Sequence, residues 1–216
     1  MKTTLKTEYY DNGQKKSEWN DINGKKDGLW TEWYDNGEKR RFCLGQKKSE
    51  INYKNGELDG LLTGWYENGQ KRGDGNFENG KKEGLWTVWY ENGQKKNEVN
   101  WKDGKQEECT THWYYDGQII LVENFKNGKL EGPSAYWWDN GNQMFNTKYK
   151  GGMKEGLHTN WYRNGEKRCE ENWKDDKEEG LSASWDKRGN VKKRELYKNG
   201  KVVRFGLFLK KLKDSM

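Results

Sequence analysis

The sequence contains almost no proline and no long apolar run. Its 216 residues include one proline, Pro133, and 27 glycines, so glycine rather than proline must make the turns. No apolar run approaches the roughly 18 residues that a membrane-spanning helix needs. The first residues, MKTTLKTEYYDNG, lack the apolar segment of a signal peptide. We therefore expect a cytoplasmic protein, the alternative being an exported form whose leader has been removed.

Cysteine and histidine are also scarce, which limits the available chemistry. The three cysteines, Cys43, Cys109 and Cys169, are far apart and odd in number, which favours reduced thiols over a disulfide framework or a zinc site. There is no CxxC, HxxxH or phosphate-loop motif. The two histidines, His112 and His158, read best as surface-facing side chains. We therefore expect no catalytic residue, no metal and no cofactor, and predict that the protein is not an enzyme.

Apolar residues are few, but aromatic residues are abundant. Only 30% of the residues are hydrophobic and 35% are charged, a composition typical of disordered chains. The 13 Trp, 12 Tyr and 6 Phe argue against disorder, because they can supply most of the buried area. The 41 basic and 35 acidic residues give a net charge of +6 and are mixed along the chain. This mixing makes nucleic acid an improbable partner.

A 24-residue repeat organises the chain. Each repeat contains two turn signals. One ends a tryptophan segment, as Asn92-Gly93 does, and the other, such as Asn79-Gly80, recurs at the same spacing. A further glycine, such as Gly84, follows the second signal by four residues. One repeat carries eight extra residues around Lys39–Lys48, where the step from Gly37 to Gly69 is 32. The glycines that end each tryptophan segment at steps of 24 are Gly69, Gly93, Gly117, Gly141, Gly165 and Gly189. The tryptophans at one fixed position of the repeat are Trp33, Trp65, Trp89, Trp113, Trp137, Trp161 and Trp185.

Each repeat predicts one β-hairpin. Residues 85–90 are rich in aromatic and β-branched side chains, and Asn92-Gly93, a strong signal for a type I′ turn, follows them. Residues 95–102 form the predicted return strand, and Asp103-Gly104 turns the chain into the next repeat. The predicted fold is all-β, an elongated array of antiparallel hairpins in 24-residue units that form a single twisted sheet.

Alternation along the first strand of each repeat defines two faces. We call the side with Leu85, Thr87 and Trp89 the constant face, because its residues hardly change between repeats. The other side, with Trp86 and Val88, is the variable face. We predict that the constant face packs and that the variable face binds a partner. The alternative is that stacked Trp and Tyr side chains of the constant face line a ligand groove.

The repeat resembles a known family. The unit G-L-W-T-x-W-Y-x-N-G-x-x-K, followed by an aromatic residue and x-N/D-G-K-x-x-G, is similar to the variant MORN repeat over roughly residues 9–200. Departures are Glu108 for glycine, Pro133 after Gly132, Asp175-Asp176 at a turn, and the insertion. The resemblance implies a single-layer β-sheet array without catalytic chemistry. Many bacterial members are described as antitoxins or immunity proteins, and eukaryotic relatives are linked to phosphoinositide membranes and scaffolding.

The predicted organisation is one repeat array over residues 1–200, with its insertion near 39–48, and a C-terminal segment over 201–216. Cys43 lies in the insertion beside basic residues that would favour a thiolate, although a structural role suits it better. Residues 201–216 are apolar with a basic end, and we expect them to cap the last repeat. The alternative is an anchor on a membrane surface.

We predict a scaffold that binds a partner protein. One hypothesis for the partner is a toxin, which the protein would neutralise as an antitoxin or immunity protein. The alternative is an adaptor on anionic phospholipid. The oligomeric state and the partner's identity are not predicted. Exposed aromatic side chains commonly carry binding energy. The predicted partner-binding residues are Trp30, Tyr34, Trp86, Val88, Tyr90, His112, Tyr114, Tyr136, Trp138, His158 and Tyr162.

Overall fold

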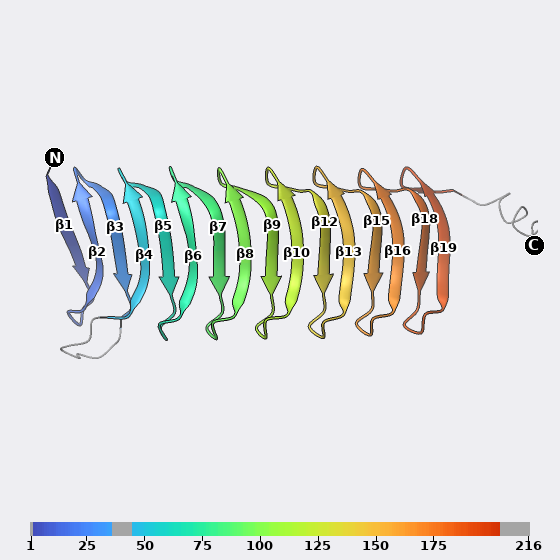
Figure 1. The fold of residues 1–216 in the computed structure, drawn as a ribbon, viewed down its shortest axis with the longest axis horizontal. Coiled ribbons are helices and arrows are strands. Elements are labelled where there is room, and N and C mark those ends of the chain that lie inside the picture. Colours follow the sequence, from blue (N-terminus) through green and yellow to red (C-terminus); the bar gives the residue numbers. More distant parts are fainter. Residues whose placement is uncertain (1, 36–44, 204–216) are drawn as a thin grey trace, which may run out of the picture. The chain divides into compact units, whose positions relative to one another are not determined.

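The computed structural model describes residues 2–35 and 45–203. Every regular element in these ranges is a β-strand, and neighbouring strands pair antiparallel, which confirms the all-β hairpin prediction (Figure 1). The chain divides into two compact units, Met1–Gly117 and Gln118–Met216. None of the described residues forms a helix long and apolar enough to cross a membrane. Cys43, most of the insertion and residues 204–216 of the predicted C-terminal cap lie outside the described residues.

The first unit contains nine strands that pair in chain order. Each strand from β2 to β8 is hydrogen-bonded to the strand before it and the strand after it. The strands are β1 (Thr3–Tyr9), β2 (Lys15–Ile22), β3 (Lys25–Trp33), β4 (Lys47–Lys54), β5 (Glu57–Trp65), β6 (Lys71–Glu78), β7 (Lys81–Trp89), β8 (Lys95–Lys102) and β9 (Lys105–Trp113).

The second unit repeats this pattern, but its first strands are each split into a short and a longer piece. Both pieces pair with the same return strand, as β11 and β12 do with β10. The strands are β10 (Ile119–Lys126), β11 (Lys129–Leu130), β12 (Gly132–Trp137), β13 (Gln143–Lys150), β14 (Met153–Lys154), β15 (Gly156–Trp161), β16 (Lys167–Lys174), β17 (Lys177–Glu178), β18 (Gly180–Trp185), β19 (Val191–Lys198) and β20 (Lys201–Val202).

The two Asn-Gly signals of a repeat form different turns. At Asn79-Gly80 both residues have positive φ, 49° and 76°, as a type I′ turn requires. At Asn92-Gly93 only the glycine does, with φ 83°. There the Gly93 N–H donates to the Tyr90 carbonyl and the Tyr90 N–H donates to the Gln94 carbonyl. The predicted type I′ turn at Asn92-Gly93 was therefore wrong, because the hairpin closes through a longer loop that ends in a left-handed glycine.

The glycine inside each first strand marks an irregular step in the pairing. Gly84 has φ 71°, and the register of β6 with β7 shifts beside it, between Asp74 and Asn76. Glu108 adopts φ 58° at the equivalent position of β9, although a side chain there is strained. Elsewhere an asparagine side chain spans the irregular step, as when Asn52 Nδ2 donates to the Leu61 carbonyl over 2.9 Å.

Burial divides the side chains differently from the prediction. Three threonines of the constant face, Thr31, Thr87 and Thr159, are buried, but its leucines are not, since Leu61 is 64% exposed and Leu85 is 50% exposed. The remaining buried side chains all lie on the variable face. They are Ser17, Ser49, Val99, Thr110, Leu121, Ser134, Thr147 and His158. The prediction that the constant face forms the packing ladder was therefore wrong for its leucines.

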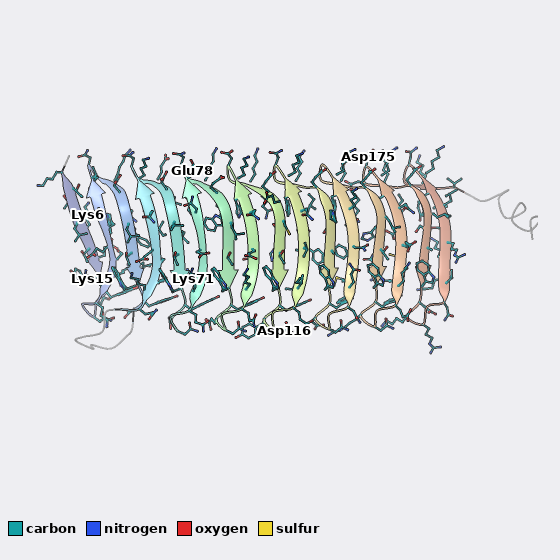
Figure 2. All side chains as sticks on the ribbon, viewed as in Figure 1. Lys6, Lys15, Lys71, Glu78, Asp116 and Asp175 are labelled. Atoms are coloured by element: carbon teal, nitrogen blue, oxygen red, sulfur yellow. The ribbon has the colours of Figure 1, made fainter. Side chains whose placement is uncertain are left out.

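The turns carry charged side chains at both edges of the sheet in each unit. In Figure 2, Glu78 and Asp175 lie at the edge of the type I′ turns, and Asp116 lies at the opposite edge, which we call the loop edge. The type I′ turn edge of the second unit is rich in exposed lysine. These lysines are Lys126, Lys129, Lys150, Lys174, Lys177, Lys198 and Lys201.

Candidate functional site

At the loop edge, tyrosine hydroxyls tie several repeats to the repeat that follows. Tyr34 donates to the Trp65 carbonyl over 2.8 Å, and Tyr90 donates to the Trp113 carbonyl over 2.9 Å. Tyr162 makes the same contact with the Trp185 carbonyl, over 3.0 Å. Three of the predicted partner-binding residues are thus already engaged in joining repeats. A phenol that donates inside the fold no longer offers its O–H proton to a partner.

At the type I′ turn edge, a carboxylate has the same linking role. The acid that precedes the strand glycine accepts a hydrogen bond from a backbone N–H of the next turn, about one repeat further on. Glu83 accepts from the Asp103 N–H over 2.8 Å, and Glu131 accepts from the Gly151 N–H over 2.6 Å. These repeated acids therefore stabilise the array and are not candidates for acid–base catalysis.

The variable face of the first unit is apolar at its centre. Three cross-strand pairs occupy equivalent places there, namely Trp30–Ile51, Leu62–Gly75 and Trp86–Val99. The Trp86 ring covers Gly75 so closely that an added Cβ on that glycine would lie 2.1 Å from a ring carbon. Trp86 also packs edge-on against Phe77, with ring centroids 4.9 Å apart, and its Nε1 donates to the Asn76 carbonyl over 3.1 Å.

Lysine ammonium groups lie among these rings. Lys82 Nζ is 4.4 Å from the centroid of Trp86 and 4.5 Å from that of Trp101. Lys26 Nζ lies 4.7 Å from the centroid of Trp30 and also contacts the rings of Trp19 and Tyr53. Cation–π attraction therefore orders the tryptophans and adds positive charge to an otherwise apolar surface.

The variable face of the second unit is polar at the same positions. Its three equivalent pairs are Ser134–Thr147, His158–Glu171 and Ser182–Glu195. Tyr136 lies beside them and stacks on Phe145, with ring centroids 4.5 Å apart. Burial raises the pKa of the Glu123 carboxyl, although its hydrogen bond with Tyr136 acts in the opposite sense. The two units thus present chemically different surfaces on one scaffold.

His158 is the least accessible of the predicted binding residues. It is only 7% exposed, and burial lowers its pKa, so the neutral ring is favoured. Its Nε2 lies 3.1 Å from Asn160 Nδ2, and Asn160 Nδ2 lies 3.2 Å from Cys169 Sγ. Burial raises the pKa of the Cys169 thiol, which disfavours a nucleophilic thiolate. The expectation of a surface-facing His158 was wrong, because neighbouring side chains of the variable face cover it.

The predicted residues fall into two groups rather than one site. Trp30, Trp86, Val88, His112 and Tyr136 are half-buried on the variable face, His112 with a pKa lowered by burial. Tyr34, Tyr90, Tyr114, Trp138 and Tyr162 follow the first strands at the loop edge, also half-buried. Sequence reasoning missed the lysines among the rings, Lys26, Lys82 and Lys154. The sequence feature that could have identified them is their fixed place in the repeat, two residues after the second residue of the type I′ turn.

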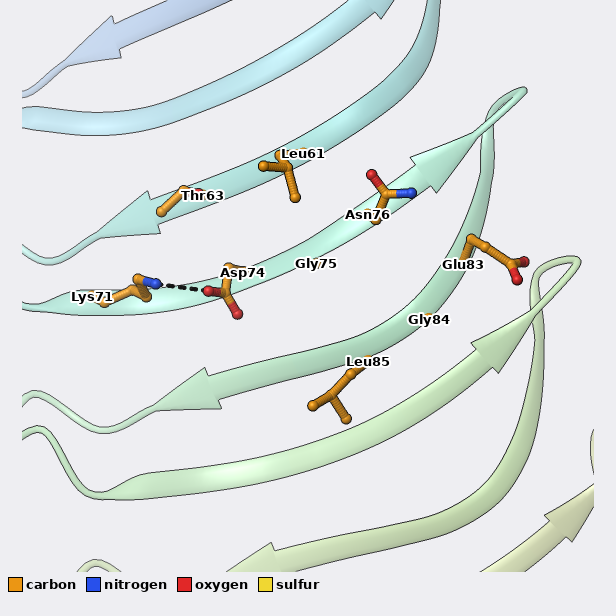
Figure 3. Close-up of a pocket in the computed structure, with 9 residues that line it drawn as sticks. All are labelled: Leu61, Thr63, Lys71, Asp74, Gly75, Asn76, Glu83, Gly84 and Leu85. Atoms are coloured by element: carbon orange, nitrogen blue, oxygen red, sulfur yellow. Dashed lines mark hydrogen bonds and ion pairs between the residues drawn. The ribbon is translucent and has the colours of Figure 1, made fainter.

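A groove lies on the opposite, constant face of the first unit (Figure 3). It encloses about 420 Å³ between the exposed side chains of Leu61 and Leu85, and the Lys71–Asp74 ion pair, 2.7 Å long, lies at one end. A second hollow of about 410 Å³ lies at the loop edge beside Tyr34 and Tyr66. In the part of the chain that the structure describes, no three His, Cys, Asp or Glu side chains are grouped so as to hold a metal ion.

Comparison with known families agrees with this geometry. Three segments, residues 26–41, 58–79 and 82–103, match the family model described as MORN repeat variant. No curated protein matches the chain. The matched segments cover β3 and β5 to β8 of the first unit, and the second unit has the same kinds of turn and of link between repeats. The first unit therefore contains repeats of the variant MORN type.

Proposed function

We propose that this protein is a non-enzymatic scaffold that binds a partner protein through its variable face. The proposal rests on a contrast between the hydrogen bonds that join repeats, which recur, and the side chains of the variable face, which change. The tyrosine and carboxylate links recur from repeat to repeat, whereas the central pairs of the variable face change from Trp86–Val99 to Ser134–Thr147. A scaffold with constant links and changing surface residues is typical of recognition by repeat proteins.

The proposed contact begins at the tryptophans of the first unit. Trp30 and Trp86 are half-buried, rigidly held by lysine and by neighbouring rings, and large enough to act as anchors. On the second unit, considered by itself, Tyr136 is a candidate anchor among hydrogen-bonding side chains that would complement polar groups of a partner. A toxin that this protein neutralises is our hypothesis for the partner, and it rests on the family resemblance alone.

The proposal is tested by finding the partner and then measuring its affinity for variants. Capture from the native host followed by mass spectrometry identifies candidates. Trp86→Ala should then weaken binding by about 2 kcal/mol, roughly 30-fold, because a buried aromatic anchor is lost. Leu85→Ala is the matched control, since Leu85 is the preceding residue of the same strand on the opposite face. If the folded Trp86→Ala and Tyr136→Ala variants both bind with unchanged affinity, the partner binds at another surface.

One observation favours a second candidate function, binding to an anionic lipid surface. The seven exposed lysines at the type I′ turn edge of the second unit lie on consecutive turns, and each such residue can add about 1 kcal/mol near an anionic membrane. Sedimentation with phosphatidylserine vesicles tests it. Binding that falls steeply with salt, and that Lys126→Glu with Lys150→Glu abolishes, would support the lipid role. If Trp86→Ala abolished vesicle binding and the lysine changes did not, the lipid-binding surface would not be the lysine-rich edge.

A further inference from the structure

Strand β1 is the first strand of a repeat whose preceding return strand is not among the described residues. Leu5, Thr7 and Tyr9 precede Leu29, Thr31 and Trp33 by 24 residues each. The corresponding strands β3, β5 and β7 each pair with a return strand on both sides. Within the described residues, β1 pairs only with β2.

Comparison with β3 shows what a second neighbour covers. Thr31 is 8% exposed, whereas Thr7 at the same position of β1 is only half-buried. Leu5 and Tyr9 are each 61% exposed, against 45% for Leu29 and a half-buried Trp33. The outer edge of β1 therefore offers backbone groups and two apolar side chains that a paired strand would cover.

We propose that β1 pairs antiparallel with β1 of a second copy of this chain, about a two-fold axis at Thr7. In this register Leu5 lies opposite Tyr9 of the second copy, and Lys6 lies opposite its Glu8. Because side chains alternate between faces, the apolar pair shares the constant face and the ion pair shares the variable face. In this register each exposed apolar side chain lies opposite an apolar one, and each charged side chain lies opposite one of opposite sign.

The charged side chains favour this register over the one whose axis lies one residue earlier. A two-fold axis one residue earlier, at Lys6, would place the two Lys6 ammonium groups opposite each other, and like charges directly opposite are destabilising. An axis at Thr7 gives two Lys6–Glu8 pairs instead. Glu8 already accepts from Ser17 Oγ over 2.9 Å, and Lys6 lies 3.2 Å from Asp21, so both side chains are held on the variable face. The strand is therefore complementary to itself when the axis lies at Thr7.

Charge exchange tests the proposal on the full chain. Sedimentation velocity over a micromolar concentration series should give twice the mass of one chain for the wild type. Lys6→Glu should weaken the dimer by at least about tenfold, because both ion pairs become like-charge pairs. Glu8→Lys should do the same, and the double exchange Lys6→Glu with Glu8→Lys should restore dimerisation. Lys54→Glu, the same charge change at an exposed turn, should leave the dimer unaffected.

A cross-link tests the position of the axis. Residues directly opposite in an antiparallel pair have Cα atoms about 4.5–5.5 Å apart, within the range of a disulfide. Thr7→Cys should therefore form a disulfide-linked dimer on mild oxidation, above the level that the native cysteines give in the wild type. Thr3→Cys, on the same strand and face but far from the axis, should not.

Three results would overturn the proposal. These are a monomer at every concentration, a dimer that Lys6→Glu leaves intact, and failure of the double exchange to restore what each single change removed. Each variant is first shown to fold by its circular dichroism and melting temperature. A partner strand or a preceding segment of the chain on β1 would give the first result, whereas pairing through another surface would give the second.

Discussion

At the scale of single residues, the fold depends on small side chains placed beside large ones. Gly75 has ordinary backbone dihedrals, so its need for glycine comes from packing alone, because the Trp86 ring lies directly over it. Gly73, two residues earlier on β6, has only ordinary contacts of 3.4 Å and 3.6 Å where its Cβ would be. The two positions therefore separate the cost of displacing a tryptophan from the general effect of replacing glycine in a strand.

We expect Gly75→Ala to lower the free energy of unfolding by about 1–3 kcal/mol, since the new methyl group must push the Trp86 ring out of place. Gly73→Ala should have little effect or stabilise slightly, as strand glycines usually do when replaced without strain. Urea denaturation followed by circular dichroism compares the two. Equal destabilisation of both variants would show that the Trp86 ring is not held over Gly75.

Glu108 offers the opposite experiment. It adopts φ 58° where the other repeats of the first unit have glycine, a conformation that costs a side chain about 1–2 kcal/mol. Glu108→Gly should therefore raise the free energy of unfolding by about 1 kcal/mol. Glu57→Gly, in a strand with ordinary φ, should lower it by about 0.5–1 kcal/mol. Thermal melting distinguishes them, and a destabilised Glu108→Gly variant would contradict the argument.

At the scale of strands and turns, hydrogen bonds hold neighbouring repeats together at both ends of the strands. The tyrosine hydroxyl acts at the loop edge and the carboxylate at the type I′ turn edge. Burial raises the pKa of Tyr66, which accords with a neutral phenol that donates to the Trp89 carbonyl over 2.7 Å. Removing such a hydroxyl leaves the tryptophan carbonyl with one hydrogen-bond partner fewer.

Tyr66→Phe should lower the free energy of unfolding by about 1 kcal/mol, the usual net value of one hydrogen bond. Tyr90→Phe should do the same through the Trp113 carbonyl. Tyr115→Phe is the control, because Tyr115 is 58% exposed and its ring, rather than its hydroxyl, contacts Tyr90. A loss of similar size in Tyr115→Phe would mean that the hydroxyl contacts between repeats contribute nothing specific.

The strands, their spacing and the repeat could be predicted from the sequence, because alternation and turn residues are local signals. The conformation at Asn92-Gly93 could not, since Asn-Gly there and at Asn79-Gly80 is the same dipeptide in two different turns. Burial was also misjudged. Single-sheet geometry leaves Leu85 half exposed despite its constancy, while side chains from adjacent strands cover His158. Such coverage depends on neighbours one repeat away, which the sequence of one strand does not reveal.

At the scale of the whole molecule, the two units differ in the chemistry of the variable face. The first presents Trp–Val and Leu–Gly pairs, and the second presents His–Glu and Ser–Thr pairs. Titratable groups are therefore partly buried in the fold, and its stability must depend on pH. Lys154 also lowers the pKa of His158, while Glu171 acts in the opposite direction.

Burial lowers the pKa of both His112 and His158 below the ordinary value of 6.5. The folded state thus favours the neutral rings, and their stabilising contribution is present above the unfolded pKa and lost as pH falls through the folded pKa. The wild type should therefore lose stability over the acidic window that begins as the pH falls below about 6.5. A His112→Gln, His158→Gln double variant should lose clearly less over this window. Parallel pH dependence of the two proteins would refute the assignment.

The eight extra residues near position 40 leave the links between their repeats intact. Tyr34 still reaches the Trp65 carbonyl across 31 residues, and Asp27 still accepts from the Asn55 N–H across 28. Elsewhere the same links span 23 and 20 residues. Loss or duplication of one 24-residue segment would therefore bring each donor to an equivalent acceptor. Unequal recombination within the gene can thus lengthen or shorten this protein in whole steps, without a new core having to evolve.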